Sequence, residues 1–389
     1  MRKLVPLILV VGCLVITLLN RAPRLVDENE NKVATKPPYG TTVSDKVQDL
    51  HQQLTIADLH ADSLLWGRDL LQRSRYGHVD IPRLVDGNVA LQVFSLPTKT
   101  PHGLNIESNT DKSDDIFWLA VVERWPPRTW NSLTERALYQ AQRLHEFSTA
   151  SRGGFTLIES ASGLASYLER RRAKPRITAG LLAIEGAHAL DGKLENLDVL
   201  YGAGYRMMSP SHFFDTDIGG SAAGVGKIGL TEKGREWVRQ MEARHMIIDL
   251  AHASAKTIDD VLAVATRPVV VSHTGVKGTC DNNRNLTDEQ VRAVAAKGGL
   301  IGIGYWDTAS CGTDARAIVR AMKYVSDRVG VEHVALGSDF DGAVTEPFDT
   351  TGLIEITAAM VEAGYSDEDI RKIMGGNAVK FLEENLPER

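Results

Sequence analysis

The chain has 389 residues, of which 43% are hydrophobic and 24% charged, and its formal net charge at pH 7 is −6. These values allow a large core beneath an ordinary soluble, globular surface. The body contains no dense run of Lys and Arg, so binding to nucleic acid lacks the positive patch that it requires.

The N-terminal residues depart from this composition. Arg2 and Lys3 precede an uncharged, largely apolar run at residues 4–19, which predicts an uncleaved membrane anchor over residues 1–20. A cleaved signal is the second interpretation, and lipidation of Cys13 is the third. Residues 21–45 are poor in apolar groups and predict a polar linker. We therefore expect the body to lie outside the cytoplasm, in the periplasm of a bacterial cell.

From residue 55 onward, short apolar runs alternate with amphipathic helical patterns. Eight runs predict strands, at residues 55–59, 89–95, 177–184, 205–209, 246–250, 269–272, 299–305 and 334–337. A long excursion at about 98–152 is predicted to be an insertion after the second strand, and the run at 155–159 predicts an extra strand. The clearest helical patterns cover residues 229–244, 257–265, 287–297, 314–329, 354–363 and 367–384.

Strands that alternate with helices indicate a parallel sheet, and nearly continuous apolar strands indicate a sheet covered on both faces. An open doubly wound sheet and a closed barrel share these local signals. The count of eight favours an α/β fold of the (β/α)₈ TIM type, built as one domain over residues 46–389.

Residues with metal-ligand or acid–base chemistry follow successive strands. In chain order they are His60 and Asp62, Glu185, His212, His252, His273, and Asp339 with Asp341. The carboxyl ends of barrel strands meet at one mouth, so these side chains are expected to converge there. Imidazoles and carboxylates are the ligands of hydrolytic zinc centres, although manganese or cobalt could use the same set. The pattern predicts a binuclear metal site.

Six short motifs occur in a fixed order: DLHAD at 58–62, IEGAH at 184–188, DLAH at 249–252, SHT at 272–274, NNRN at 282–285 and GSDFDG at 337–342. Together they resemble the membrane dipeptidase (renal dipeptidase) family of the amidohydrolase superfamily. The resemblance extends from about residue 47 to residue 382. It implies a metallo-dipeptidase with a dipeptide substrate and two Zn²⁺ per chain.

Carried over residue by residue, the resemblance implies a role for each motif. His60 and Asp62 would bind one zinc, His252 and His273 would bind the other, and Glu185 would bridge them. A water shared by the metals would become hydroxide near neutral pH and attack the amide. Asp339 would take the proton of the water and pass it to the leaving amine. His212 would bind the scissile carbonyl oxygen, and Arg284 would bind the terminal carboxylate of the substrate.

Several alternatives stay open. Asp341 could replace Asp339 as the acid–base group, and His188 is interpreted as structural or as a support for the ligands. Another amidohydrolase reaction, such as deacylation of an N-acyl amino acid or opening of a cyclic amide, would also use a carboxylate-bearing substrate. A non-catalytic, membrane-tethered binding protein is the other class. The sequence leaves the oligomeric state undecided, with a homodimer as one alternative.

The body contains two cysteines, Cys280 and Cys311. The animal members of the resembled family have a cysteine pair at matching places, and an exported protein would meet an oxidising compartment. The resemblance therefore implies a Cys280–Cys311 disulfide, with two free thiols as the alternative in a reduced protein.

Overall fold

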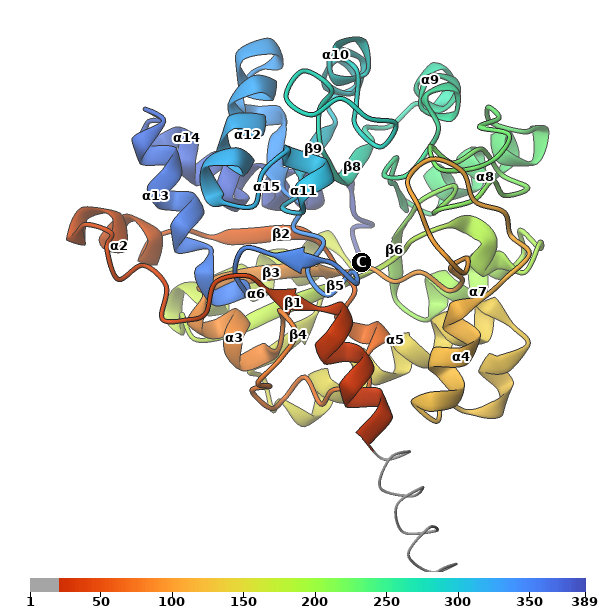
Figure 1. Ribbon diagram of the computed structural model, residues 1–389, viewed down its shortest axis with the longest axis horizontal. Coiled ribbons are helices and arrows are strands. Elements are labelled where there is room, and N and C mark those ends of the chain that lie inside the picture. Colours follow the sequence, from red (N-terminus) through yellow and green to blue (C-terminus); the bar gives the residue numbers. More distant parts are fainter. Residues whose placement is uncertain (1–20) are drawn as a thin grey trace, which may run out of the picture.

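The computed structural model describes residues 21–389, and its centre is a sheet of parallel strands surrounded by helices (Figure 1). The strand order is β7-β6-β5-β3-β2-β10-β9-β8, and β4 pairs additionally with β5. The strands are β2 Ile56–Ala61, β3 Val89–Phe94, β4 Phe155–Leu157, β5 Thr178–Ile184, β6 Tyr205–Met208, β7 Ile247–Ile248, β8 Val270–Thr274, β9 Leu300–Ile303 and β10 Val334–Leu336. Each of the eight predicted runs overlaps one strand, and the predicted extra strand is β4.

The strands at the two ends of this order also lie side by side. Asp249, directly after β7, forms a parallel bridge with Val270 of β8. The backbone N–H of Leu250 donates to the carbonyl oxygen of Val270 at 2.7 Å. Eight of the nine strands are entirely buried, and β4 is the exception. Burial on both faces explains their apolar sequences.

Helices connect most of the strands, and many begin where a Ser, Thr or Asp side chain caps the first turn. Thr287 and Gln290 form the capping box that the sequence predicts. The α-helices are α2 Asp45–Gln52, α3 Ile81–Asp86, α4 Asp115–Val122, α5 Leu133–Ala150, α6 Ala161–Ala173, α7 Asn196–Gly202, α8 Glu232–Ala243, α9 Ala255–Val264, α10 Asp288–Ala296, α11 Asp307–Ser310, α12 Ala315–Val329, α13 Ile354–Glu362, α14 Asp367–Arg371 and α15 Asn377–Asn385.

The predicted insertion after the second strand contains α4 and α5, and it packs onto the loop that follows β2. Leu65 and Trp66 of that loop form a separate buried cluster with Ile116, Ala120 and Trp125 of the insertion. The insertion thereby becomes a wall above the carboxyl end of the sheet, where the predicted site lies.

The single helix predicted over residues 367–384 is interrupted. α14 passes into a π-helical turn at Lys372–Gly376 before α15 begins. A Cβ atom on Gly375 would lie 2.0 Å from the carbonyl oxygen of Thr55. Glycine therefore lets the helix backbone approach β2 closely, and the regular spiral gives way at that point.

The predicted anchor at residues 1–20 lies outside the described residues. Among residues 21–389, no helix has both the length and the apolar character needed to cross a membrane. The prediction of an unpacked polar linker over residues 21–45 needs correction. Residues 21–30 are helical, and β1 Lys32–Val33 pairs in parallel with β11 Thr345–Glu346. Asp27 is only 1% exposed, because partners distant in sequence satisfy its charge.

Candidate active site

The predicted metal-ligand and catalytic side chains gather at the carboxyl end of the sheet. Six of them are buried, and Asp339 is partly exposed. They are His60 within β2, Asp62 directly after β2, Glu185 directly after β5, His212 and His252 in the loops after β6 and β7, His273 within β8, and Asp339 in the loop after β10. The parallel arrangement explains this convergence, since all the strand ends point the same way.

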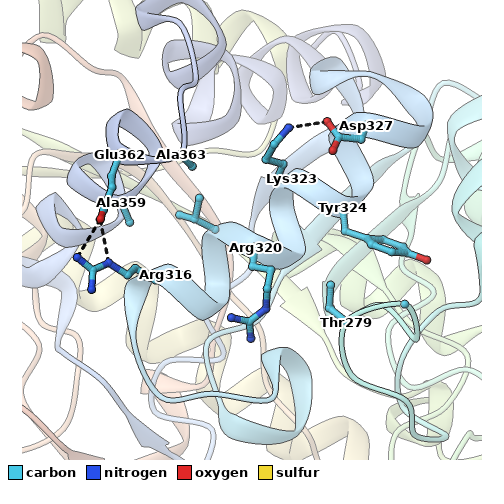
Figure 2. Close-up of a pocket in the computed structure, with 11 residues that line it drawn as sticks. Thr279, Arg316, Arg320, Lys323, Tyr324, Asp327, Ala359, Glu362 and Ala363 are labelled. Atoms are coloured by element: carbon cyan, nitrogen blue, oxygen red, sulfur yellow. Dashed lines mark hydrogen bonds and ion pairs between the residues drawn. The ribbon is translucent and has the colours of Figure 1, made fainter.

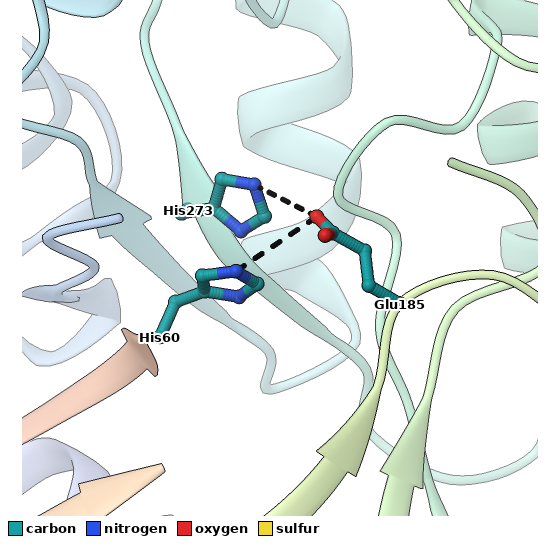
Figure 3. Close-up of side chains that lie close together, drawn as sticks. All are labelled: His60, Glu185 and His273. Atoms are coloured by element: carbon teal, nitrogen blue, oxygen red, sulfur yellow. Dashed lines mark ion pairs between the residues drawn. The ribbon is translucent and has the colours of Figure 1, made fainter. Parts of the chain in front are cut away.

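Glu185 lies at the centre of the group, and three ring nitrogens face its Oε1 atom. The Nε2 atoms of His252, His273 and His60 lie 2.8, 3.2 and 3.8 Å from it, and Figure 3 shows two of these contacts. The Nε2 atom of His212 lies 3.2 Å from the other carboxylate oxygen, Oε2. Glu185 belongs to two groups of residues with the spacing of a metal site, and its carboxylate would serve both.

A second cluster adjoins the first through His60. Its Nε2 atom lies 3.5 Å from Asp62 Oδ2 and 3.8 Å from Asp339 Oδ1. His60, Asp62 and Asp339 together satisfy the spacing expected of a metal site, as do His60, Glu185 and His273, and also Glu185, His212 and His252. The structure thus brings together all five predicted metal ligands. It also places His212 and Asp339 within reach of a metal.

The donor set fits divalent cations. His60 Nε2, Asp62 Oδ1 and Glu185 Oε1 are buried atoms with no hydrogen-bond partner among the described residues, which is costly unless something else satisfies them. Burial lowers the pKa of His212, His252 and His273, so the imidazoles are neutral, as ligands must be. Burial also raises the pKa of Glu185 and Asp62 well above their ordinary values, a cost that bound cations would remove.

Two aspartates of the sequence motifs support the ligands. Ser272 Oγ lies 2.9 Å from His273 Nδ1 and donates to Asp249 Oδ2 at 2.6 Å. Asp58 accepts a 2.9 Å bond from the backbone N–H of Ser338, beside Asp339. Neither aspartate was predicted from the sequence to have a role. Their places in the DLHAD and DLAH motifs, two or three residues before a ligand histidine, were the available signal.

Asp339 and Asp341 have different environments. Burial raises the pKa of Asp339 to about 7, which suits a group that takes up and releases a proton near neutral pH. Burial alone would also raise the pKa of Asp341, but Arg68, His78 and Ser63 together hold it well below its usual range. Arg68 lies 2.7 Å from Asp341 Oδ2. Asp341 is therefore a permanently charged structural group, and Asp339 faces the cavity.

Backbone strain accompanies the site. His252 and Asp339 adopt left-handed conformations, with φ of 62° and 66°, which few residues other than glycine adopt. Such conformations persist where the surroundings hold them, and they are common at functional sites.

His188 does not belong to any of the candidate metal-binding groups. Its ring packs instead against Phe214, with ring centroids 5.0 Å apart.

Arg284 is buried beside the candidate metal ligands. Its Nη2 atom donates to the carbonyl oxygen of His273 at 2.9 Å, and its guanidinium lies 5.7 Å from the ring centre of Trp306. The loop that carries Arg284 is held to the loop after β9 by the Cys280–Cys311 disulfide and by Asn282, which donates to the carbonyl oxygen of Thr308 at 2.7 Å. The disulfide that the resemblance implies is therefore present.

A cavity of about 600 Å³ contains the centre. Glu185, His212, His252, Arg284 and Asp339 line it, together with apolar side chains from the insertion. Another cavity of similar volume lies outside the sheet, between α12 and α13 (Figure 2). Four of its five charged side chains form ion pairs, Arg316 with Glu362 and Lys323 with Asp327. The fifth, Arg320, donates to the carbonyl oxygen of Ser310. Only the first of these two cavities combines metal-ligand groups with a buried cation.

Comparisons with known proteins agree with this geometry. The model of the membrane dipeptidase family, peptidase family M19, matches residues 44–387. A dipeptidase from Claviceps purpurea, tcpJ, is 28% identical over 79% of this chain and 69% of its own length.

Two solved structures are similar as well. One is a dipeptidase described as a metallopeptidase of family M19, with 25% identity and a TM-score of 0.71 over 86% of this chain and 99% of that one. The other is a metallopeptidase from Rhodobacter sphaeroides bound to a phosphinate mimic of L-Ala-D-Ala, with 26% identity and a TM-score of 0.69 over 85% and 99%. The match to the family model covers most of the chain, and the chain therefore belongs to the membrane dipeptidase family of metallopeptidases.

Proposed function

We propose that this protein hydrolyses the amide bond of dipeptides at a centre of two zinc ions. His60 and Asp62 would hold one ion, His252 and His273 the other, and Glu185 both. When bound, the ions supply a Lewis acid and lower the pKa of a water toward neutrality. The observation that carries the proposal is the convergence of three imidazoles on Glu185 Oε1 in a cavity that also contains Arg284.

The other groups of the cavity would guide the substrate and its protons. Arg284 binds the terminal carboxylate through two parallel hydrogen bonds, a geometry that guanidinium matches and that limits substrate length. His212 donates a hydrogen bond to the scissile carbonyl oxygen as negative charge develops there. Asp339 takes a proton from the attacking water and delivers it to the leaving amine, consistent with its raised pKa.

A substrate panel tests this function. Purified protein is supplied with zinc, manganese or cobalt, or treated with a chelator, and assayed on dipeptides, N-acetyl amino acids and a cyclic dipeptide. We expect turnover of dipeptides that is lost with the chelator and restored by zinc, with two metals per chain by elemental analysis. Preferential turnover of N-acetyl amino acids or of the cyclic amide would replace dipeptidase activity with another amidohydrolase reaction. Binding without turnover would identify a non-catalytic protein.

We also infer that the sheet closes into a (β/α)₈ barrel, which the bridge between Asp249 and Val270 supports.

The apolar run at residues 4–19 supports a membrane tether with the body outside the cytoplasm. Protease added to spheroplasts of a bacterial host should digest the body. A body protected until the cells are lysed would refute export.

A further inference from the structure

The N-terminal arm, defined here as residues 24–35, is fixed to the body by a buried network of charges. Arg68 joins two carboxylates, with its Nε atom 2.8 Å from Asp27 Oδ2 and its Nη2 atom 2.7 Å from Asp341 Oδ2. The side chains of all three residues are at most 3% exposed. Two buried carboxylates that both contact one buried guanidinium make a specific attachment, because any of these charges left alone would be strongly unfavourable.

The arm is also bound to the loop that carries Asp339. Asn31 Oδ1 accepts a 3.0 Å bond from the backbone N–H of Ala343. His78 Nε2 lies 2.9 Å from the carbonyl oxygen of Lys32. β1 then continues the contact by pairing with β11, and Figure 1 shows the red helix of the arm leading into β1 against the body.

Two side chains of this arm line the active-site cavity. They are Val26, which is 38% exposed, and Glu30. Within residues 21–389, Glu30 makes no ion pair, and it accepts a 3.0 Å hydrogen bond from Asn29. The match to the family begins only at residue 44. A wall of the cavity is thus built by residues outside the part of the chain that the family model matches.

The charges around the cavity are unevenly placed. Arg284 reaches it from the loop after β8, whereas the arm covers the loops after β2 and β10, and Asp115 enters from α4 after β3. In the strand order, β10 and β9 separate β2 from β8, and β3 follows β2 on the far side. A dipeptide whose carboxylate is bound by Arg284 therefore extends its amino-terminal residue toward the arm and α4, where the charged groups are Glu30 and Asp115.

We propose that the N-terminal arm selects the amino-terminal residue of the dipeptide. Val26 packs against the side chain of that residue, and Glu30 favours a side chain that ends in a positive charge. The inference rests on the proposed dipeptidase function and adds to it the substrate preference of the site.

Two matched variants test the proposed role of the Glu30 carboxylate. Glu30→Gln removes the carboxylate from the cavity, and Glu28→Gln removes one from the same helix that does not line the cavity. The measured quantity is the ratio of kcat/KM for Lys-Ala to that for Ala-Ala. Glu30→Gln should lower this ratio about threefold, mainly through KM, as expected for an exposed charge pair. Glu28→Gln should leave it unchanged. No change with Glu30→Gln, or an equal change with both variants, would overturn the proposal.

A second measurement does not depend on turnover. Val26→Cys and Leu25→Cys place a thiol at two exposed positions of the arm, of which only position 26 lines the cavity. Alkylation of each is followed by mass spectrometry with and without a phosphinate analogue of Leu-Ala. The analogue should slow alkylation at position 26 and not at position 25. Equal rates at position 26 with and without the analogue would contradict the proposed contact between the arm and the substrate. A wild type that neither cleaves dipeptides nor binds the phosphinate refutes the proposed function itself.

Discussion

Among the carboxylates of the centre, Glu185 has the most histidine ring nitrogens close to it. Its two oxygens face different histidines. We expect Glu185→Gln to reduce dipeptide turnover by about 100-fold or more, because an amide offers one acceptor oxygen and turns N–H donors toward cations. Elemental analysis should show at least one metal lost. Full activity with a single bound metal would contradict the binuclear arrangement.

The proposed role of Arg284 can be tested by changing the shape of its side chain while keeping its charge. Arg284→Lys keeps a cation in the cavity but cannot form two parallel bonds to a carboxylate. Loss of such a charged hydrogen bond should lower kcat/KM for a dipeptide about 10- to 100-fold. A C-terminally amidated dipeptide should be a poor substrate for the wild type and lose much less on substitution. Equal losses on both substrates would argue against carboxylate binding.

At the scale of elements, Glu123, the residue that caps the end of α4, links the insertion to the body through the backbone of Gly67. Burial raises the pKa of Glu123 to about 7, so the folded protein holds this proton more tightly than the unfolded chain does. Its contribution to stability is therefore present at low pH and is lost as the pH rises from about 4.5 to about 7.

Replacing Glu123 by Gln should remove that pH dependence. At pH 8 the variant should be more stable than the wild type by about 2–3 kcal/mol, measured by urea unfolding at several pH values. Glu146→Gln, at an exposed position of α5, is the matched control and should follow the wild type. A Glu123→Gln variant that loses stability at pH 8 would show that the carboxylate is needed in its charged form.

The eight strands could be predicted from the sequence because strands covered on both faces leave continuous apolar runs. The metal ligands could be predicted because parallel strand ends converge. The break at Gly375 could not, since hydrophobic periodicity reports which side chains are buried and not how closely two backbones approach. The arm was missed for a related reason: Asp27 is polar, and only its pairing with Arg68, far along the chain, explains its burial.

For the whole molecule, we expect the bound metals to stabilise the fold in addition to supporting the reaction. Cations bind the folded centre and not the dispersed ligands of the unfolded chain, so their removal shifts the equilibrium toward unfolding. Chelator should lower the melting temperature by about 5–10 °C for two tightly held ions, as followed by scanning calorimetry. Glu185→Gln, which retains fewer metals, should show a smaller shift. Identical melting with and without metal would mean that the cluster does not bind cations.

The burial of Asp27 separates two boundaries that are often treated as one. The match to the family model begins at residue 44, whereas the packed unit already includes Asp27 and β1. A chain cut at residue 44 would keep every inherited motif, yet it would leave Arg68 and Asp341 without their third partner and one side of the cavity open. Relatives that share the centre can therefore differ in substrate preference through changes in a segment that lies outside the match to the family model.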